Sequence, residues 1–171
     1  MKKIFLISVT MLVMFLLIGC APAALTGANF KQEIISDANN AHIYIYWTER
    51  AANNRVDFEI IINGEQVTDL KRGGYYLYRA NPGNVDIVSS PNFTYGQMGV
   101  LDMALTANGR CSLKVEADKQ YFIRSVITGT PGSYKLQMNQ VDHERGVYEL
   151  RTAKLLPKVA SKEAPFIFAQ K

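Results

Sequence analysis

Two cysteines and two histidines carry most of the reactive chemistry available to this chain of 171 residues. A catalytic thiol needs a histidine base beside it, and nothing in the sequence places His42 or His143 next to Cys111. Cys111 lies in residues 110–116, where apolar and polar residues alternate as in a strand with one buried face. We therefore interpret Cys111 as a small buried hydrophobic residue.

One pair of carboxylates has a spacing that could support hydrolysis. Asp57 and Glu59 stand two positions apart on an expected strand, so they share a face at about 7 Å, close to the separation that glycosidases use. The same spacing is typical of a strand face in water, which is the interpretation we favour. The sequence contains no Gly-x-Ser-x-Gly, His-Glu-x-x-His, phosphate-loop or Cys-x-x-Cys motif. We expect no catalytic residue and no metal site.

The N-terminus has the layout of a signal peptide. Lys2 and Lys3 precede an apolar run over residues 4–18. A membrane-spanning helix needs about 20 apolar residues, so this run is better suited to a leader that is removed. We expect residues 1–19 to be that leader.

The end of the leader resembles the lipobox of bacterial lipoproteins. Its residues are Leu17-Ile18-Gly19-Cys20, in which Leu17 and Gly19 would be recognised by the signal peptidase. The resemblance implies that Cys20 becomes the first residue of the mature chain and carries diacylglycerol and an N-acyl chain such as palmitate. This lipid is the only prosthetic group that we expect, and it would fix the protein to a membrane of the bacterial cell envelope.

The residue after the lipobox bears on which membrane that is. Ala21, rather than aspartate, follows Cys20, which in enteric-type sorting favours the outer membrane, facing the periplasm. Residues 20–40 lack sustained periodicity, so we expect a lipidated tether. Two acyl chains already give stable anchoring.

Composition restricts the remaining classes. Loss of Lys2 and Lys3 with the leader lowers the formal net charge of +4 by two, to +2, which is too small a surplus for a nucleic-acid-binding protein. A hydrophobic content of 48% with 20% charged residues excludes a disordered chain. The length fits one folded domain.

Alternating apolar and polar residues predict a series of short strands separated by turns. The Asn63-Gly64 step between two of them indicates a tight type I′ hairpin. Strands joined by turns at this spacing are typical of a small antiparallel β-sandwich, so the expected fold class is mainly β. The expected strands are 42–48, 56–62, 65–70, 75–80, 85–89, 100–105, 110–116, 121–127 and 134–139.

A helix is expected to close the domain. Residues 141–155 have apolar residues at near-helical intervals after Asp142, a suitable N-cap. Gly146 within this stretch costs a helix about 1 kcal/mol relative to alanine. We place the sandwich with its helix at residues 41–155.

The C-terminal tail, residues 156–171, is expected to be extended. Pro157 and Pro165 prevent the helix from continuing. Phe166, Ile167 and Phe168 form an apolar cluster that a free terminus would expose. The cluster could pair with a sheet edge of its own domain or add a strand to a partner, and we favour the partner.

Turn chemistry in this chain resembles that of a known family. The matching segments are residues 61–67, with Asn63-Gly64; 73–76, with Gly73-Gly74; 81–83, which is Asn81-Pro82-Gly83; and 115–124. They are similar to the bacterial lipoproteins of domain of unknown function 2846 over residues 41–155, except for an irregular stretch between Ser90 and Asn108. The resemblance implies a small sandwich at the cell envelope and no reaction.

Aromatic residues suggest where such a protein would bind. Tyr44 and Tyr46 alternate with the expected core residues, so they could form an outward face suited to recognising protein or glycan. A helix or a second sheet covering that face is the alternative. We expect a non-catalytic binding or scaffolding module whose partner is an envelope protein. A cell-wall or polysaccharide binder is the second hypothesis, and a hydrolase of envelope material the third.

Overall fold

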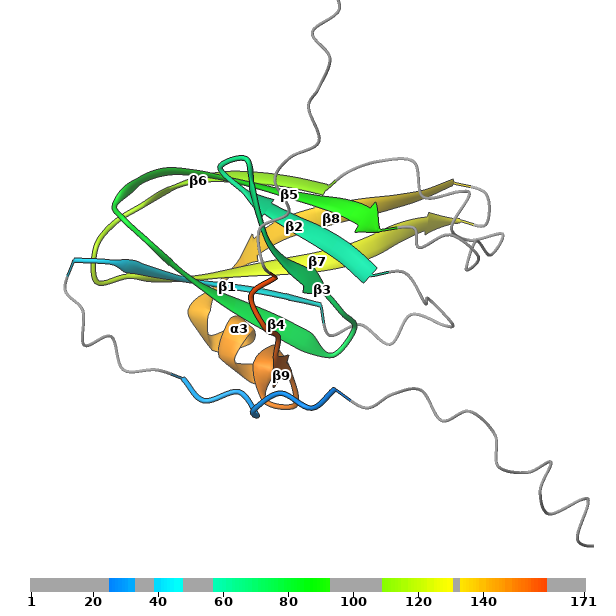
Figure 1. Ribbon diagram of the computed structural model, residues 1–171, viewed down its shortest axis with the longest axis horizontal. Coiled ribbons are helices and arrows are strands. Elements are labelled where there is room, and N and C mark those ends of the chain that lie inside the picture. Colours follow the sequence, from blue (N-terminus) through cyan, green and yellow to red (C-terminus); the bar gives the residue numbers. More distant parts are fainter. Residues whose placement is uncertain (1–24, 33–38, 48–56, 93–108, 131–132, 160–171) are drawn as a thin grey trace, which may run out of the picture.

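The computed structural model describes residues 25–32, 39–47, 57–92, 109–130 and 133–159 (Figure 1). Several predicted features lie outside these residues: the leader and lipobox (Leu17, Gly19 and Cys20), the expected strand 100–105, and the apolar cluster Phe166, Ile167 and Phe168. They stay predictions.

The described chain is mainly β, with one helix near the C-terminus. Eight of the expected strands are present, with ends that differ by up to three residues. The elements are β1 (Ala41–Trp47), β2 (Asp57–Ile62), β3 (Glu65–Leu70), β4 (Gly74–Ala80), β5 (Gly83–Asn92), β6 (Gly109–Val115), β7 (Gln120–Thr130), β8 (Ser133–Val141), α3 (His143–Leu150) and β9 (Lys154–Leu155).

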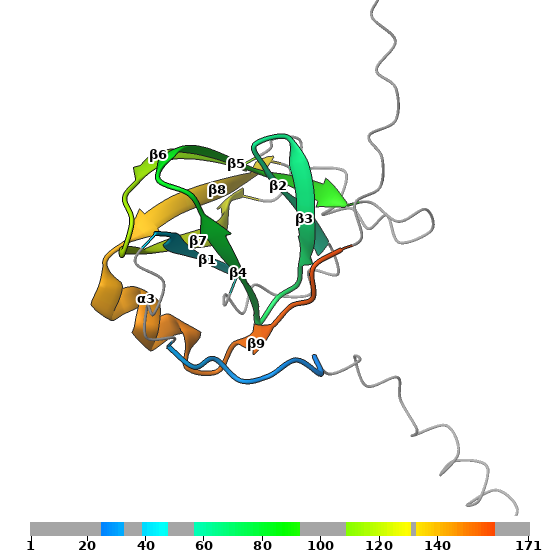
Figure 2. The ribbon, with the colours of Figure 1, turned by 60° about the vertical axis from the view of Figure 1, so that its left-hand side comes forward.

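The strands form two sheets that face each other. Sheet A has the order β8-β7-β1-β4-β9 and sheet B the order β3-β2-β5-β6. Most neighbours are antiparallel, as predicted, but β1 pairs with β7 and β4 with β9 in parallel. The predicted β-sandwich with a C-terminal helix is therefore confirmed, and sheet A is mixed. Figure 2 shows the two layers, with α3 beside sheet A.

The main core lies between the sheets. On β1, Ile43, Ile45 and Trp47 point inward, and on β2 Phe58 and Ile60 do the same. The rings of Trp47 and Phe58 meet edge to face, with centroids 4.9 Å apart. Burial of each such side chain stabilises the fold by about 1.5–3 kcal/mol, so this alternation dictates which face of each strand turns inward.

A second core covers the outer face of sheet A. Tyr44 and Tyr46, on the opposite side of β1 from Ile43, are both 0% exposed and pack with Phe122 and Leu150. Both faces of β1 are therefore buried, because α3 and residues 25–32 cover the second one. This is the alternative that the sequence left open for the tyrosines.

The helix begins where it was predicted and ends earlier. The side chain of Asp142 accepts a hydrogen bond from the backbone N–H of Arg145 at 2.8 Å, which makes Asp142 the N-cap. The helix ends at Leu150 rather than at residue 155, because Lys154 and Leu155 pair with β4 instead. No helix in the described parts of the chain is long and apolar enough to cross a membrane.

Both ends of the described chain pack on the body beyond the predicted limits. In residues 25–32, here called the N-terminal segment, Phe30 packs edge to face on Tyr44 and Tyr75, with centroids 5.6 and 5.4 Å away. The backbone N–H of Phe30 donates to the carbonyl of Ala153 at 3.0 Å. Part of the stretch expected to be a free tether is therefore folded onto sheet A.

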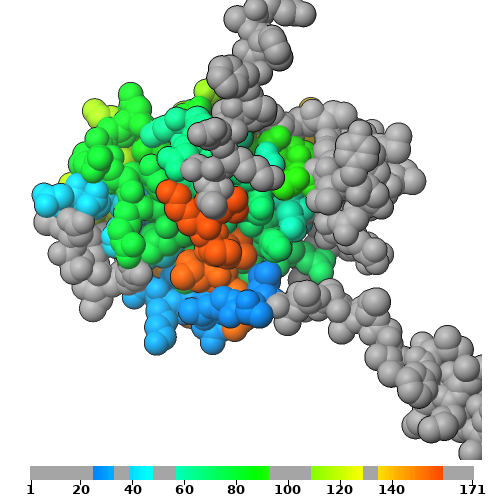
Figure 3. All heavy atoms as spheres, viewed as in Figure 1, coloured from blue at the N-terminus to red at the C-terminus, as the bar shows by residue number. Residues whose placement is uncertain are grey.

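Residues 156–159, the C-terminal segment, join the two sheets along one side. The backbone N–H of Leu156 donates to the carbonyl of Tyr75 on β4, and that of Val159 donates to the carbonyl of Val67 on β3. The first residues of the predicted tail thus lie along the edges of their own sheets. In Figure 3 this segment (orange) and the N-terminal segment (blue) lie side by side on the surface.

Candidate functional site

The outer face of sheet B differs from that of sheet A because it is open to solvent along β5 and β6. Residues of β6 alternate between exposed and more buried, with Arg110, Ser112 and Lys114 exposed. On β5, Asn84 is exposed and Asp86 half-buried on the same face. Strand periodicity therefore gathers five polar side chains on one surface.

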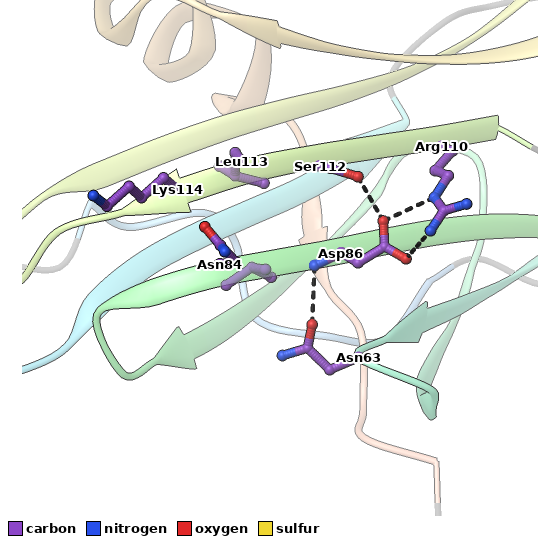
Figure 4. Close-up of a pocket in the computed structure, with 8 residues that line it drawn as sticks. Asn63, Asn84, Asp86, Arg110, Ser112, Leu113 and Lys114 are labelled. Carbon is purple, nitrogen blue, oxygen red and sulfur yellow. Dashed lines mark hydrogen bonds and ion pairs between the residues drawn. The ribbon is translucent and has the colours of Figure 1, made fainter.

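These side chains line a groove with a volume of about 480 Å³ (Figure 4). Register brings them together: Asn84 lies opposite Lys114, and Asp86 opposite Ser112, on adjacent antiparallel strands. Asn63 lies at one side of the groove. The side chains of Val85 and Leu113 turn toward the main core, so these two residues line the groove with their backbone. The groove is here called the sheet B groove.

Asp86 holds the groove together. Its carboxylate accepts hydrogen bonds from Nε of Arg110 at 2.9 Å and Nη2 of Arg110 at 2.7 Å, and a third from the hydroxyl of Ser112 at 2.6 Å. These hydrogen bonds, from Arg110 first and then Ser112, lower the pKa of Asp86 below its ordinary value. Asp86 is therefore ionised at neutral pH, with both oxygens occupied.

The β2–β3 hairpin adds a second fixed element. Asn63 and Gly64 have φ values of 49° and 87°, as the predicted type I′ turn requires. The backbone N–H of Asp86 donates to Oδ1 of Asn63 at 2.9 Å, and the N–H of Asn63 donates to the carbonyl of Asp86 at 2.9 Å. The turn is thus bound to the centre of β5, and the groove is preorganised.

This arrangement suits binding better than catalysis. A general acid or base needs a group that can gain or lose a proton near neutral pH, whereas Asp86 is held ionised by Arg110 and Ser112. Within the described residues no cluster of histidine, cysteine and carboxylate side chains could hold a metal ion. The groove offers fixed hydrogen-bonding groups around a neutralised carboxylate.

Cys111 and Asp57, whose residue types could support catalysis, have surroundings that explain them as structural residues. Cys111 is half-buried against the main core, and burial, followed by the charge of Asp86, raises the pKa of its thiol, so the thiolate is disfavoured. Asp57 lies 3.7 Å from Lys71 at the protein surface, and burial raises the pKa of its carboxyl. The Cys111 thiol is therefore not activated as a nucleophile, and the Asp57 carboxylate is paired with Lys71.

The histidines lie away from the groove, one on sheet A and one in α3. His42 is buried on β1. His143, at the start of α3, has its Nε2 2.9 Å from Nε2 of Gln32 and 3.2 Å from Oε1 of Gln120. His143 therefore helps to hold the N-terminal segment against sheet A.

The predicted partner-binding tyrosines are not available to a partner. Tyr44 stacks on Phe122, with centroids 4.9 Å apart, and Tyr46 donates its hydroxyl hydrogen to Glu149 of α3 at 2.7 Å. Burial, then the hydrogen bond to Glu149, raises the pKa of Tyr46 far above its ordinary value. Their prediction as an exposed binding face was wrong, because the helix packs on them.

The sheet B groove was not predicted from the sequence. The signal available was the polar residues at alternate positions of β5 and β6, Asn84 and Asp86 on one strand and Arg110, Ser112 and Lys114 on the other. Alternation predicts a polar face, but only the pairing of β5 with β6 shows which side chains meet.

Comparison with known proteins identifies one family. A family model described as "Protein of unknown function (DUF2846)" matches residues 37–138. No curated protein and no solved structure gives a match. The matched stretch contains every residue that lines the sheet B groove and ends before α3.

Proposed function

The chain belongs to the DUF2846 family of proteins of unknown function, and we propose that it is a non-catalytic lipoprotein anchored in the bacterial cell envelope. In this proposal Cys20 carries the lipid, after a signal peptidase has recognised Leu17 and Gly19. The folded body lies at the outer membrane, facing the periplasm, and binds another envelope component. The observation that carries the proposal is that one side of the body is closed and the other carries an open, preorganised groove.

The closed side is the one from which the chain runs toward Cys20. The N-terminal segment begins at the edge of the body beside β9 and β3, and it reaches the outer face of sheet A at Phe30. The groove lies on the outer face of sheet B along β5 and β6, on the other side of the body (Figures 1 and 2). Cys20 precedes Leu25 by five residues, which reach at most about 17 Å when extended. A lipid on Cys20 would therefore hold the start of the N-terminal segment near the bilayer and leave the groove facing away from it.

The described part of the chain ends at Val159, on the β3 edge of sheet B. Val159 and Leu25 line the same surface pocket of about 320 Å³. The backbone N–H of Val159 donates to the carbonyl of Val67, and β3 has only two residues before Val67, since it begins at Glu65. An extended tail would carry Phe166 about 23 Å beyond Val159, past the end of that edge. The cluster Phe166, Ile167 and Phe168 is thus proposed as a contact with an envelope protein.

Cellular fractionation tests the anchor. Wild-type protein should be found in the membrane fraction with acyl chains on Cys20 detected by mass spectrometry. Cys20→Ala should be soluble or should keep its leader. Wild-type levels of the variant in the outer membrane would contradict the proposed anchor.

Cross-linking in cells tests the binding role. A photoreactive residue in place of Asn84, in the groove, should form a discrete product with an envelope component. The control position is Tyr148, which is 66% exposed on α3, and it should not form that product. The same product from both positions, or none from Asn84, would contradict binding through the groove.

A further inference from the structure

We infer that the sheet B groove binds a glycan that bears oxyanions, a saccharide polymer with carboxylate or phosphate groups. This inference rests on the proposed function, because it names the envelope component that the groove would hold. It follows from the balance of charge, from the donors that remain open, and from the residue types that line the groove.

The charge of the groove favours an anion. Arg110 and Lys114 each contribute a positive charge, and Asp86 contributes the one negative charge among the lining residues. Arg110 has its charge partly balanced by Asp86 through the bidentate ion pair at 2.7 Å, which leaves Lys114 in excess. An anion in this groove would meet a net positive surface whose carboxylate is already neutralised.

The groups left open are mostly donors. The side chains of Lys114 and Asn84 make no hydrogen bond or ion pair with other described residues. Asn63 uses its Oδ1 to accept from the N–H of Asp86, so its Nδ2 hydrogens remain for a ligand. Ser112 donates to Asp86, so its oxygen can still accept. A ligand rich in acceptor oxygens, with some hydroxyl donors, matches this inventory, and a saccharide with oxyanions has both.

The shape of the groove fits a chain lying across a sheet. The polar side chains that line the groove come from two neighbouring strands and the hairpin turn, and those of β5 and β6 lie on the outer face of sheet B (Figure 4). Because the groove is a surface feature of about 480 Å³, a polymer can pass through it without entering the protein. The hydrogen bonds of Asp86 fix the floor, so a ligand would order few side chains on binding.

The residue types favour a glycan over a protein surface. Protein interfaces are enriched in tyrosine, tryptophan, phenylalanine and methionine at their centres, and depleted in lysine, aspartate and serine. Three of the residues that line the groove, Asp86, Ser112 and Lys114, are of the types depleted at protein interfaces. A hydrated, oxygen-rich polymer suits such a surface better than a folded protein does.

Affinity electrophoresis tests the inference with full-length protein purified in detergent. Native gels would contain polygalacturonate as the carboxylate polymer, phosphomannan as the phosphate polymer, or dextran as the neutral one. We expect at least one acidic polymer to retard the wild-type protein and dextran to have no effect. Lys114→Ala and Asn84→Ala should each weaken retardation at least threefold.

A matched variant separates recognition from net charge. Lys135→Ala removes one positive charge from an exposed position on β8, in the other sheet, and should leave retardation nearly unchanged. Equal weakening by Lys135→Ala and Lys114→Ala would overturn the inference, as would equal retardation by dextran. If neither acidic polymer retards the wild-type protein while cross-linking from Asn84 persists, the glycan inference is overturned and the proposed function stands.

Discussion

Gly146 lies in the middle of α3, where helix propensity alone favours alanine by about 1 kcal/mol. The structure predicts the opposite outcome for Gly146→Ala. A Cβ at this position would overlap the ring of Phe122, and it would stand 2.6 Å from Cβ of Phe122, where ordinary contacts are 3.4–4 Å. The helix or the ring would have to move by about an ångström.

The ring of Phe122 has no room to move. Phe122 is 1% exposed, stacks on Tyr44 with 9° between the rings, and meets His143 edge to face. Overpacking of a tight core costs typically 1–3 kcal/mol, and we take the upper end because the overlap involves a ring held on both sides. Against the propensity gain of about 1 kcal/mol, Gly146→Ala should lower the free energy of unfolding by about 2 kcal/mol.

Urea denaturation of Gly146→Ala, Phe122→Ala and the double variant measures this effect. The double variant should lose less stability than the two single variants added together, because alanine at position 122 removes the Cγ and Cδ1 atoms that lie nearest to the new methyl group. An increase in stability for Gly146→Ala, or strict additivity, would show that α3 does not pack this closely on sheet A.

Three further predictions follow from the described contacts. Gly64→Val should lower the free energy of unfolding, measured by urea denaturation, by about 1–3 kcal/mol because φ at this position is 87°, whereas Gly64→Asn should lower it much less. Equal losses for the two variants would show that the turn is not type I′. Glu149→Ala should lower the free energy of unfolding by about 2–4 kcal/mol, since it leaves Tyr46 and Arg124 without the carboxylate that they contact at 2.7 and 3.1 Å. Arg145 is half exposed, so Arg145→Ala should lower it by less than about 1 kcal/mol. A larger loss for Arg145→Ala than for Glu149→Ala would contradict this network. Burial alone would raise the pKa of Glu149, but hydrogen bonds from Arg145 and Tyr46, with the charges of Arg124 and Arg145, keep that pKa below its ordinary value. The contribution of Glu149 to stability is therefore present above about pH 4.5 and is lost as the pH falls through the folded-state pKa. Melting curves from pH 7 to 3 should therefore show a smaller acid-dependent loss for Glu149→Gln than for wild type, and parallel losses would refute the assignment.

Local signals were sufficient for the parts of the fold that depend on neighbouring residues. Asn63-Gly64 predicted the hairpin because positive φ at both positions restricts the residue types that fit. Asp142 predicted the start of α3 because its side chain reaches the N–H of Arg145, three residues away. Each of these features is decided within a few residues of sequence.

Features that depend on distant residues were missed. The apolar residue Leu155 continued the helical pattern, but pairing with Tyr75 on β4 ends the helix earlier. Tyr44 and Tyr46 appeared outward-facing because α3, about 100 residues later in the chain, is what buries them. Gly146 looked like a defect in the helix because the ring that requires it is on β7.

The sheet B groove also depends on residues that are far apart in the sequence. Asp86 and Arg110 are 24 residues apart, and their ion pair exists because β5 and β6 pair in one particular register. A shift of one residue would move every side chain of β6 to the other face. The residues of the groove could therefore be recognised from the sequence as polar strand residues, but not as one surface.

The central claim is that the anchored side and the binding side of the body are opposite, and the position of each relative to a bilayer tests it most directly. Full-length acylated protein in liposomes would carry a donor dye on Thr26→Cys, in the N-terminal segment, or on Asn84→Cys, in the groove, each in a Cys111→Ser background. Energy transfer to acceptor dyes on the lipid headgroups should be strong from position 26 and weak from position 84. Equal transfer from both positions, or stronger transfer from the groove, would contradict the account.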